Sequence, residues 1–364
     1  MTYSDSAELH IDLAALQENY KTLAAQAPTA ITAAVVKADG YGLGLSEVSK
    51  ALHAAGCTVF FVAQTQEAMA LRALLDDATI YVLNGLPHDA ANDFAAHNLR
   101  PCLISLAQIQ QWQDYCKAHQ PLPACLFVDT GFNRLGLAET DIVDLAATPA
   151  LFEGWELSLI ASHLACSDSP EHPMNGAQLE RFRHILTQLP DAPASLANSG
   201  GVMLGDAYHF DMTRVGIMLY GGAATARAED ALAPVAALRA PLLQIRQISA
   251  GETVGYGATF TASGDMSIGI LSLGYGDGLG RHFGNLSPSK LRFMLNGHPV
   301  PLLGRISMDS LAVDLTDCPV APHAGDLVEI FGANNLLDDV ASQGNTIAYE
   351  LLTSLGKRYK RNYS

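Results

Sequence analysis

The stretch AAVVKADGYG, residues 33–42, joins a short apolar run to one lysine and a glycine-rich turn. The apolar run is typical of a buried strand, which would leave Lys37 at the strand's end with little water around it. Because burial disfavours the ammonium form, we expect a lowered pKa for Lys37, and a neutral amine can form a Schiff base with an aldehyde. Gly40 and Gly42 would allow a tight turn, and Tyr41 would offer its hydroxyl to a phosphate group. On this stretch alone, a lysine that caps a strand and points into solvent explains the residues equally well.

Strand-like and helix-like segments alternate over roughly the first 230 residues. Apolar runs rich in Val, Ile, Leu or Phe lie near residues 33–36, 57–63, 79–83, 100–104, 124–128, 157–162, 194–197 and, more weakly, 208–212. Stretches with helical periodicity flank them, including 11–25, 67–75, 107–117 and 178–189. This alternation predicts parallel strands, and about eight such units close into a (β/α)₈ barrel. A doubly wound open sheet is the alternative, although no G-x-G-x-x-G opens the first helix, which disfavours its dinucleotide-binding form.

Several of the expected strands end in a residue that can do chemistry. These residues are Lys37, Asn84, Asp129 with Arg134 just beyond, His163, and the pair Asn198 and Ser199. In a barrel of parallel strands all the carboxyl ends meet at one face, which is the face that carries active sites. In any other arrangement their recurrence at strand ends would be coincidence. The sequence therefore predicts an α/β protein whose barrel carries a site at this face.

The character of the chain changes after about residue 235. Pro234 and Pro241 flank an alanine-rich join. Short β-like runs follow at 242–249, 267–273, 291–295, 311–315 and 326–331, and a helical pattern at 335–342. We therefore expect two domains, a barrel over residues 1–235 and a smaller, mostly β domain over residues 236–364.

The 364-residue chain has a formal net charge of −16 at pH 7, and only 16% of its residues are charged. An excess of negative charge disfavours binding to nucleic acid or to an anionic membrane, because both carry the same sign. No uninterrupted apolar run reaches the roughly 18 residues that a membrane span needs. We expect neither nucleic acid nor a membrane as a partner.

The six cysteines lie far apart and include no C-x-x-C pair. The first residues show no basic stretch followed by an apolar core, so no signal peptide is visible and we expect reduced thiols in a cytoplasmic protein. The twelve histidines include no H-E-x-x-H, and His163 with Cys166 is the only ligand-like spacing. We therefore expect no metal site.

Motifs in both halves of the chain carry a family resemblance. They are AVVKADGYGLG (34–44), DTGFNRLG (129–136), SHLACSD (162–168), LANSGG (196–201), TRVGIMLYG (213–221), VGYGATFTA (254–262), GYGDG (274–278), GRISMDS (304–310) and AYELL (348–352). In this order and across both expected domains, they resemble those of bacterial alanine racemases, which are pyridoxal-phosphate enzymes of fold type III. The resemblance implies a barrel that binds pyridoxal 5′-phosphate, a C-terminal β domain, and interconversion of L-alanine and D-alanine.

By this resemblance, Lys37 would hold the cofactor as a Schiff base and then act as the base for D-alanine, while Tyr256 would be the base for L-alanine. Racemisation requires removal of the α-proton from one face and delivery of a proton to the other. A neutral tyrosine is a weak base, so we expect nearby cations to favour its ionised form. Arg134 is the first of these cations, and the family also uses it to bind the substrate carboxylate, with the backbone N–H of Met308 as a second donor.

The resemblance also implies a cofactor-binding set. Arg214 would lie against the pyridine nitrogen, and because arginine keeps its proton, that nitrogen would stay unprotonated. His163 would support Arg214 and the catalytic tyrosine through hydrogen bonds, and Ser195 stands where some members have histidine. The phosphate would be bound by Tyr41, Ser199, Tyr349 and the backbone N–H groups of Gly216 and Ile217, with Asn198 as a neighbouring support. The family's substrate corridor would be lined by Tyr275, Arg281, Arg305 and Ile347, with Tyr256 and Tyr349 at its narrowest point.

One departure from the family pattern concerns Phe127. Many members carry a lysine here, seven residues before the arginine that matches Arg134, and that lysine is modified by carbon dioxide. Phenylalanine cannot form this carbamate. Asn133 is the candidate for orienting Arg134 instead, and without a replacement we expect weaker binding of the substrate carboxylate.

In the family each active site is shared, with Lys37 from one subunit and Tyr256 and Met308 from the other, so we expect an obligate head-to-tail homodimer with two-fold symmetry. The alternatives are a racemase of serine or of a broader range of amino acids, a fold-type III decarboxylase, and a non-catalytic pyridoxal-phosphate-binding protein. Decarboxylases typically place an acid near the pyridine nitrogen, and the non-catalytic proteins usually lack the β domain. The sequence does not distinguish a biosynthetic from a catabolic role.

Overall fold

The computed structural model describes residues 5–225, 227, 231–285 and 291–364. These residues fall into two compact units. The unit we call the barrel unit comprises Leu16–Leu219 and Ala223–Leu232, and the β unit comprises Met1–Ala15, Tyr220–Gly222 and Ala233–Ser364. The chain therefore contributes its first residues to the same unit as its last ones.

The barrel unit is built on a parallel sheet with the strand order β8-β7-β6-β5-β4-β3-β2-β9 in the described part of the chain. The strands are β2 (Ile31–Val35), β3 (Val59–Val62), β4 (Thr79–Val82), β5 (Leu99–Leu103), β6 (Pro123–Phe127), β7 (Glu156–Ala161), β8 (Ala194–Ser195) and β9 (Met212–Val215). The two edges meet, because Asp211 N–H donates to the Ala194 carbonyl at 3.0 Å and Arg214 N–H to the Ala197 carbonyl at 2.9 Å. The predicted (β/α)₈ barrel is confirmed.

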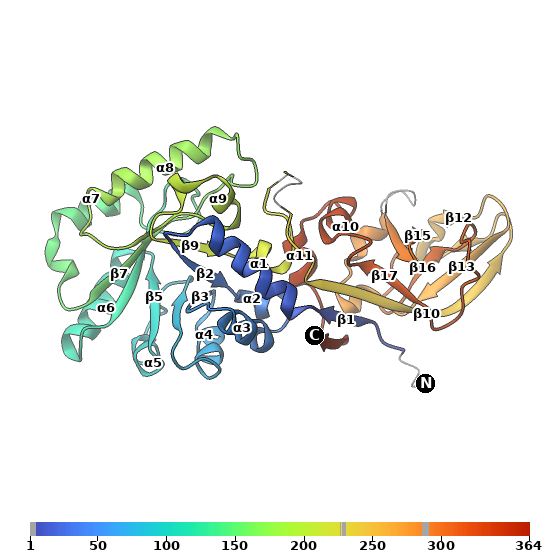
Figure 1. The fold of residues 1–364 in the computed structure, drawn as a ribbon, viewed down its shortest axis with the longest axis horizontal. Coiled ribbons are helices and arrows are strands. Elements are labelled where there is room, and N and C mark those ends of the chain that lie inside the picture. The colour runs from blue at the N-terminus through green and yellow to red at the C-terminus, as the bar shows by residue number, and fades with distance from the viewer. Residues whose placement is uncertain (1–4, 226, 228–230, 286–290) are drawn as a thin grey trace. The chain divides into compact units, whose positions relative to one another are not determined.

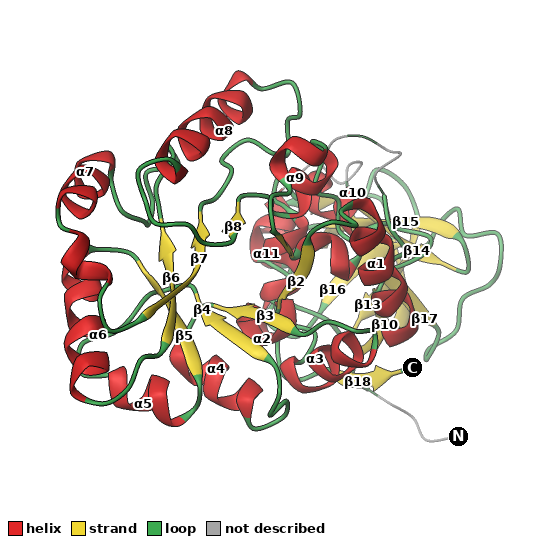
Figure 2. Ribbon diagram, turned by 60° about the vertical axis from the view of Figure 1, so that its left-hand side comes forward, coloured by secondary structure: helices red, strands yellow, loops and turns green. Residues whose placement is uncertain are grey.

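The helices of the barrel unit lie outside its strands (Figure 2). They are α1 (Leu13–Gln26), α3 (Leu45–Ala54), α4 (Thr65–Arg72), α5 (Ala91–Ala96), α6 (Leu106–Ala118), α7 (Glu139–Ala147), α8 (Pro173–Leu186) and the short α9 (Ser199–Met203). Helix α8 illustrates their origin, since Leu179, Phe182 and Ile185 repeat at helical spacing and are buried. Pro173 at its first position has the φ angle that a helix start needs.

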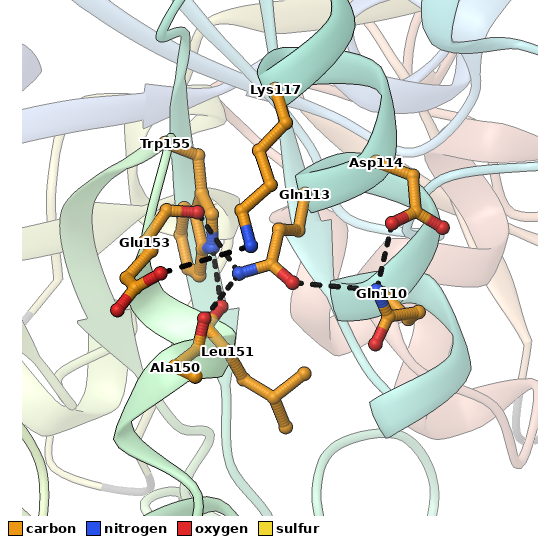
Figure 3. Close-up of polar contacts among 8 residues, drawn as sticks. All are labelled: Gln110, Gln113, Asp114, Lys117, Ala150, Leu151, Glu153 and Trp155. Atoms are coloured by element: carbon orange, nitrogen blue, oxygen red, sulfur yellow. Dashed lines mark hydrogen bonds and ion pairs between the residues drawn. The ribbon is translucent and has the colours of Figure 1, made fainter.

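A polar cluster fastens α6 to the short helix η1 (Pro149–Phe152) that precedes β7 (Figure 3). The buried Gln113 side chain donates from Nε2 to the carbonyls of Ala150 at 2.5 Å and Glu153 at 2.9 Å. Trp155 Nε1–H donates to the Leu151 carbonyl at 2.8 Å. Because these residues precede β7, the cluster secures the barrel at the amino end of a strand, opposite the face expected to carry the site.

Two sequence predictions about the first 230 residues need correction. The strand expected at 208–212 is wrong: Asp206–Tyr208 forms a 3₁₀ turn, and β9 begins only at Met212, after Phe210 with its positive φ of 52°. The helix expected from Ile11 begins at Leu13. Ile11 belongs instead to a strand, and the Asp12 carboxylate accepts from Ala15 N–H at 2.8 Å, as a residue that caps a helix start does.

The β unit is a mainly antiparallel sheet that closes on itself, and Figure 1 shows β10 running along its length. Its strands are β1 (Glu8–Ile11), β10 (Ala236–Ile248), β13 (Met266–Leu271), β14 (Arg292–Leu295), β15 (His298–Leu303), β16 (Leu311–Asp314), β17 (Leu327–Phe331) and β18 (Lys360–Tyr363). The first half of β10 pairs with β1 and β17 and the second half with β13, which closes the ring β13-β16-β15-β14-β17-β10. Helices α10 (Leu337–Gln343) and α11 (Ala348–Thr353) follow β17.

Candidate active site

Lys37 lies just past the end of β2 and begins the turn α2 (Lys37–Tyr41). Its pKa is lowered, first because burial disfavours the ammonium form and second because the Arg134 guanidinium repels it. The Glu67 carboxylate acts in the opposite direction. The expected direction of the pKa of Lys37 is therefore confirmed, and more of the amine is in the neutral, nucleophilic form.

The turn that follows Lys37 is left-handed over five consecutive residues, from Ala38 to Gly42. Ala38, Asp39, Gly40 and Tyr41 have φ angles of 54°, 58°, 61° and 56°. Left-handed backbone costs about 1–2 kcal/mol for each residue that has a side chain. Backbone bonds stabilise the turn, including Gly40 N–H to the Val36 carbonyl at 2.9 Å. The sequence predicted a tight turn from Gly40 and Gly42, but not that Ala38, Asp39 and Tyr41 share this conformation.

Tyr41, Ser199 and Gly216 meet at the carboxyl ends of β2, β8 and β9. A Cβ atom at Gly216 would lie only 2.4 Å from the Tyr41 hydroxyl, so a larger residue here would displace the tyrosine or the backbone. Gly216 N–H donates to Ser199 Oγ at 2.8 Å. Asn198 supports this corner, since its side chain caps α9 by accepting from Gly201 N–H at 2.9 Å. The hydroxyls of Tyr41 and Ser199 thus lie close to the start of the 3₁₀ helix Ile217–Tyr220.

Arg214 is buried in the barrel on β9, with 3% of its surface exposed. Its guanidinium donates to the Ser195 carbonyl at 2.9 Å, to Ser195 Oγ at 2.5 Å and to the Ser162 carbonyl. Among the described residues, no carboxylate pairs with it. Burial lowers the pKa of Arg214 to about 10, so the side chain still carries its positive charge at neutral pH. A buried cation with only neutral partners suits a site that receives an anionic ligand.

His163 does not make the hydrogen bond to Arg214 that the sequence analysis expected. The donors of Arg214 are engaged by Ser195 and Ser162, and the His163 ring instead packs edge-on against Phe132, with centroids 5.6 Å apart. Burial and the charges of Arg214, Arg134 and Lys37 hold the pKa of His163 well below its usual range. His163 is therefore a neutral side chain among cations.

Asp129 organises the loop that carries Arg134. Its carboxylate accepts from the backbone N–H groups of Gly131 at 2.8 Å, Phe132 at 2.9 Å and Asn133 at 2.9 Å. The Arg134 guanidinium lies over the Phe132 ring, 4.1 Å from its centroid. No hydrogen bond joins the Asn133 side chain to Arg134 among the described contacts, so the expectation that Asn133 orients this arginine is wrong.

Two residues that hold the site together were not identified from the sequence. Gln178 on α8 is fully buried and accepts from Ala165 N–H at 2.8 Å, while its Nε2 donates to the His163 carbonyl at 2.9 Å and to Thr130 Oγ1 at 3.0 Å. It therefore joins the loop after β7 to the loop after β6. Glu67 on α4 bonds the turn beside Lys37. Neither residue stands in a motif that marks it.

In the β unit, Tyr256 lies on a turn between the two-residue strands β11 (Thr253–Val254) and β12 (Phe260–Thr261). The flanking glycines have positive φ angles, 74° at Gly255 and 76° at Gly257. The Tyr256 side chain is 66% exposed. Arg305 lies close by, since a Cβ atom at Gly257 would be 2.9 Å from its Nη1. The strands on either side of the turn contribute Val254 and Phe260 to an apolar cluster.

A second pair of turns in the β unit carries Tyr275 and Met308. Tyr275 N–H donates to the Ser307 carbonyl at 3.0 Å, and Gly276 N–H to the Met308 carbonyl at 2.8 Å. Arg358 links the same turns, because its guanidinium contacts Asp277 at 3.1 Å and Asp309 at 2.7 Å. The remaining predicted residues of this unit are partly or largely exposed: Arg281, Ile347 and Tyr349.

Comparison with known families settles the relationship. A family model of the alanine racemase N-terminal domain matches residues 11–224, and one of the alanine racemase C-terminal domain matches residues 235–363. The chain belongs to the alanine racemase family.

Individual members of the family are similar to this chain over nearly its whole length. An alanine racemase of Agrobacterium fabrum described as catabolic is 44% identical, covering 98% of this chain and 92% of its own length. A second from the same organism, described as biosynthetic, is 41% identical with 98% and 93% coverage. The alanine racemase of Bartonella henselae, solved with covalently bound pyridoxal phosphate, is 41% identical with a TM-score of 0.95, covering 99% of this chain and all of that one. Identity to a catabolic and to a biosynthetic racemase is nearly equal, so it does not assign the biological role.

The residues of this racemase's barrel fit pyridoxal phosphate, the cofactor of the family. The aldehyde requires an amine that is neutral, which the lowered pKa of Lys37 favours. The pyridine ring suits the buried Arg214, which has no acidic partner among the described residues. The anionic phosphate suits the hydroxyls of Tyr41 and Ser199, which lie at the Gly216 backbone. The match to a racemase C-terminal domain also disfavours a barrel-only, non-catalytic binding protein.

Two further findings concern other kinds of site. Among the residues that the structure describes, no group of three or more His, Cys, Asp or Glu side chains is arranged to hold a metal ion. No helix in the described ranges is long and apolar enough to cross a membrane.

Proposed function

We propose that this chain interconverts L-alanine and D-alanine with pyridoxal phosphate, using Lys37 and Tyr256 as its two bases. The observation that supports this most is the placement of Lys37, with a lowered pKa, beside a barrel mouth that also carries the buried Arg214. The agreement with alanine racemases over both domains supports the substrate.

The two bases divide the proton transfers between them. When bound, pyridoxal phosphate withdraws electrons from the α-carbon of the amino acid and so makes its proton more acidic. The neutral Lys37 amine takes or returns that proton on one face, and Tyr256 does so on the other, which is what inversion of the centre requires. Arg214 keeps its own proton, so the electron withdrawal stays moderate and return of the α-proton is favoured over loss of another group.

Arg134 binds the substrate carboxylate in this proposal. Its guanidinium offers paired donors, and packing on Phe132 limits the directions in which it can point. The backbone N–H of Met308 is the second donor. Phe127 stands where many members have the modified lysine, so that lysine cannot hold Arg134 here. In the described structure the ring of Phe132 packs against Arg134 instead.

Tyr41, Ser199 and the backbone of Gly216 and Ile217 are proposed to bind the phosphate, with Asn198 as support and Tyr349 as a further ligand. Tyr275, Arg281, Arg305 and Ile347 are proposed to line the corridor for substrate. A narrow corridor discriminates by size, but one methylene changes specificity by only about 1–3 kcal/mol. Slow turnover of serine is therefore expected.

We further propose that the enzyme is a head-to-tail homodimer in which Lys37 works with Tyr256 of the partner subunit. The exposure of large side chains at the β-unit turns supports this, with Tyr256 66%, Ile347 61% and Met308 54% exposed. Mixing subunits tests it. Lys37→Ala and Tyr256→Phe homodimers are both inactive, but hybrid dimers regain one complete site, so an equal mixture recovers about a quarter of wild-type activity. If both bases came from one chain, no activity would return.

The reaction itself is tested by proton NMR of L-alanine in D₂O with the purified protein, followed by chiral chromatography. Loss of the α-proton together with D-alanine rising to equal amounts is the expected result. Exchange without D-alanine means that one base acts alone, which contradicts the two-base proposal. No exchange with cofactor bound rules out alanine and favours serine or a broader range of amino acids. The cytoplasmic location suggested by the sequence stays a prediction.

A further inference from the structure

The turn after Lys37 needs stabilisation beyond its own backbone. Ala38, Asp39 and Tyr41 all carry side chains and all have positive φ angles, and each costs about 1–2 kcal/mol in this conformation. Asp39 supports the far end of the turn, because its Oδ1 accepts from Leu45 N–H at 2.8 Å. The near end, next to Lys37, has a different support.

That support is the Glu67 carboxylate, which reaches the turn from α4. Its Oε1 accepts from Ala38 N–H at 2.6 Å. Its Oε2 accepts from Ala63 N–H at 2.9 Å and Gln64 N–H at 3.1 Å. Both oxygens are therefore fixed, and the carboxylate links the residues after β3 to the residue directly after Lys37. Hydrogen bonds from N–H groups to a charged carboxylate are about twice as strong as neutral ones.

The charges around the Lys37 amine are mostly positive. Arg134 from the loop after β6 repels the ammonium form, and Arg214, Arg134 and Lys37 all act on the neighbouring neutral His163. Glu67 is the acidic group that acts on Lys37 in the opposite direction. The same carboxylate thus fixes the backbone next to the amine and moderates its electrostatic surroundings.

We propose that Glu67 is a positioning residue for Lys37, which holds the left-handed turn at Ala38 and offsets the positive charge around the amine. The proposal rests on the assignment of Lys37 as a base. It differs from an ordinary helix cap in one respect: replacing the carboxylate changes the protonation of Lys37 as well as the fold of the turn.

The test measures Lys37 in the full chain freed of cofactor by treatment with hydroxylamine followed by dialysis. Trace acetylation with acetic anhydride, followed by mass spectrometry across a range of pH, gives the pKa of this amine without substrate. In Glu67→Gln the pKa of Lys37 falls by about one unit, the usual size of effect for a lost opposite charge close by. The matched control is Glu47→Gln, which removes an exposed carboxylate paired with Lys50 at 3.5 Å. An unchanged or raised pKa of Lys37 in Glu67→Gln overturns the proposal.

A second variant, Glu67→Asp, separates charge from reach. The shorter side chain keeps the charge, so the pKa of Lys37 stays near that of the wild type, but it cannot span Ala38 and Ala63 together. We expect kcat in the loaded enzyme to fall at least about tenfold with little change in KM, because the base is misplaced. Wild-type kcat in this variant contradicts the positioning role. Because the acetylation uses no substrate, failure of the alanine reaction would not be mistaken for failure of this proposal.

Discussion

The turns that carry the two proposed bases, Lys37 and Tyr256, are stabilised in contrasting ways. Both contain left-handed residues, but the Lys37 turn is fixed by the carboxylates of Asp39 and Glu67. The Tyr256 turn joins two-residue strands, and its phenol is 66% exposed. The first base is thus positioned within its own unit, whereas the second is presented outward. The barrel unit thus fixes the backbone at Lys37 with its own residues, whereas Tyr256 has few contacts within its unit, which fits the proposed completion of its surroundings by a partner subunit.

The largest expected effect is from Lys37→Ala, which removes the base that the barrel positions. Racemisation falls at least about 10⁴-fold, since general base catalysis and the covalent link to the cofactor are both lost. Chiral chromatography of alanine measures it. The control is Lys117→Ala, which removes an exposed lysine 3.9 Å from Glu153 in the polar cluster of Figure 3. Racemisation close to wild type in Lys37→Ala would remove this residue from the mechanism.

The next effect is from Tyr256→Phe, which tests the outward-facing base. Racemisation falls about 10²–10⁴-fold, the usual range for one general acid or base. Exchange of the α-proton in D₂O falls much further for L-alanine than for D-alanine, because Lys37 still works on the latter. Equal loss of exchange for both enantiomers contradicts the division of labour.

Much of the barrel was predictable from the sequence for a simple physical reason. Strands buried on both faces are continuous apolar runs, and the run at 33–36 lies within two residues of β2. Strands without such runs were missed: β1 has only four residues, and β15 contains Pro299 and Pro301. The β9 strand was misplaced because Phe210 looks like a strand residue, whereas its positive φ is set by tertiary structure.

The site was predictable where a motif identifies a side chain by its chemistry, as for Lys37 and Arg214. It was not predictable where the role is to accept backbone N–H groups from a distant segment. Gln178 accepts from Ala165 N–H, 13 residues away along the chain, and Glu67 accepts from Ala38 N–H, 29 residues away. The expected hydrogen bond of His163 failed for a related reason, because backbone carbonyls and Ser195 occupy the donors of Arg214.

A smaller effect is expected from Gly216→Ala, which perturbs the barrel unit near Tyr41 without changing either proposed base. The added Cβ would lie 2.4 Å from the Tyr41 hydroxyl, so the tyrosine or the strand end must move. We expect affinity for pyridoxal phosphate to fall about tenfold, equivalent to roughly 1.4 kcal/mol, as measured by equilibrium dialysis. In the control Gly176→Ala, on α8, the new Cβ meets nothing within 4 Å. That helix position gains about 0.5–1 kcal/mol of stability and leaves cofactor affinity unchanged.

The smallest expected effect is on the pH dependence of the free energy of unfolding, through His163 and the cations around it. In the folded chain the pKa of His163 lies well below the usual value, whereas in the unfolded chain it is about 6.5. Below pH 6.5 the unfolded chain therefore binds more protons, and the free energy of unfolding falls as pH falls, by at most about 1.4 kcal/mol per pH unit from this residue. Urea unfolding of the cofactor-free chain between pH 5 and pH 7.5 measures the slope.

His163→Gln removes this contribution, so its unfolding free energy depends less steeply on pH than that of the wild type. His88→Gln is the matched control, because His88 is an exposed histidine whose ring contacts only Asp89 among the described residues, and its slope stays that of the wild type. Equal slopes in His163→Gln and the wild type would mean that the histidine is protonated alike in both states. In that case, burial and the positive charges of Lys37, Arg134 and Arg214 would not lower the pKa of His163 in solution. The surroundings of Lys37 would then be as open to solvent as those of Tyr256.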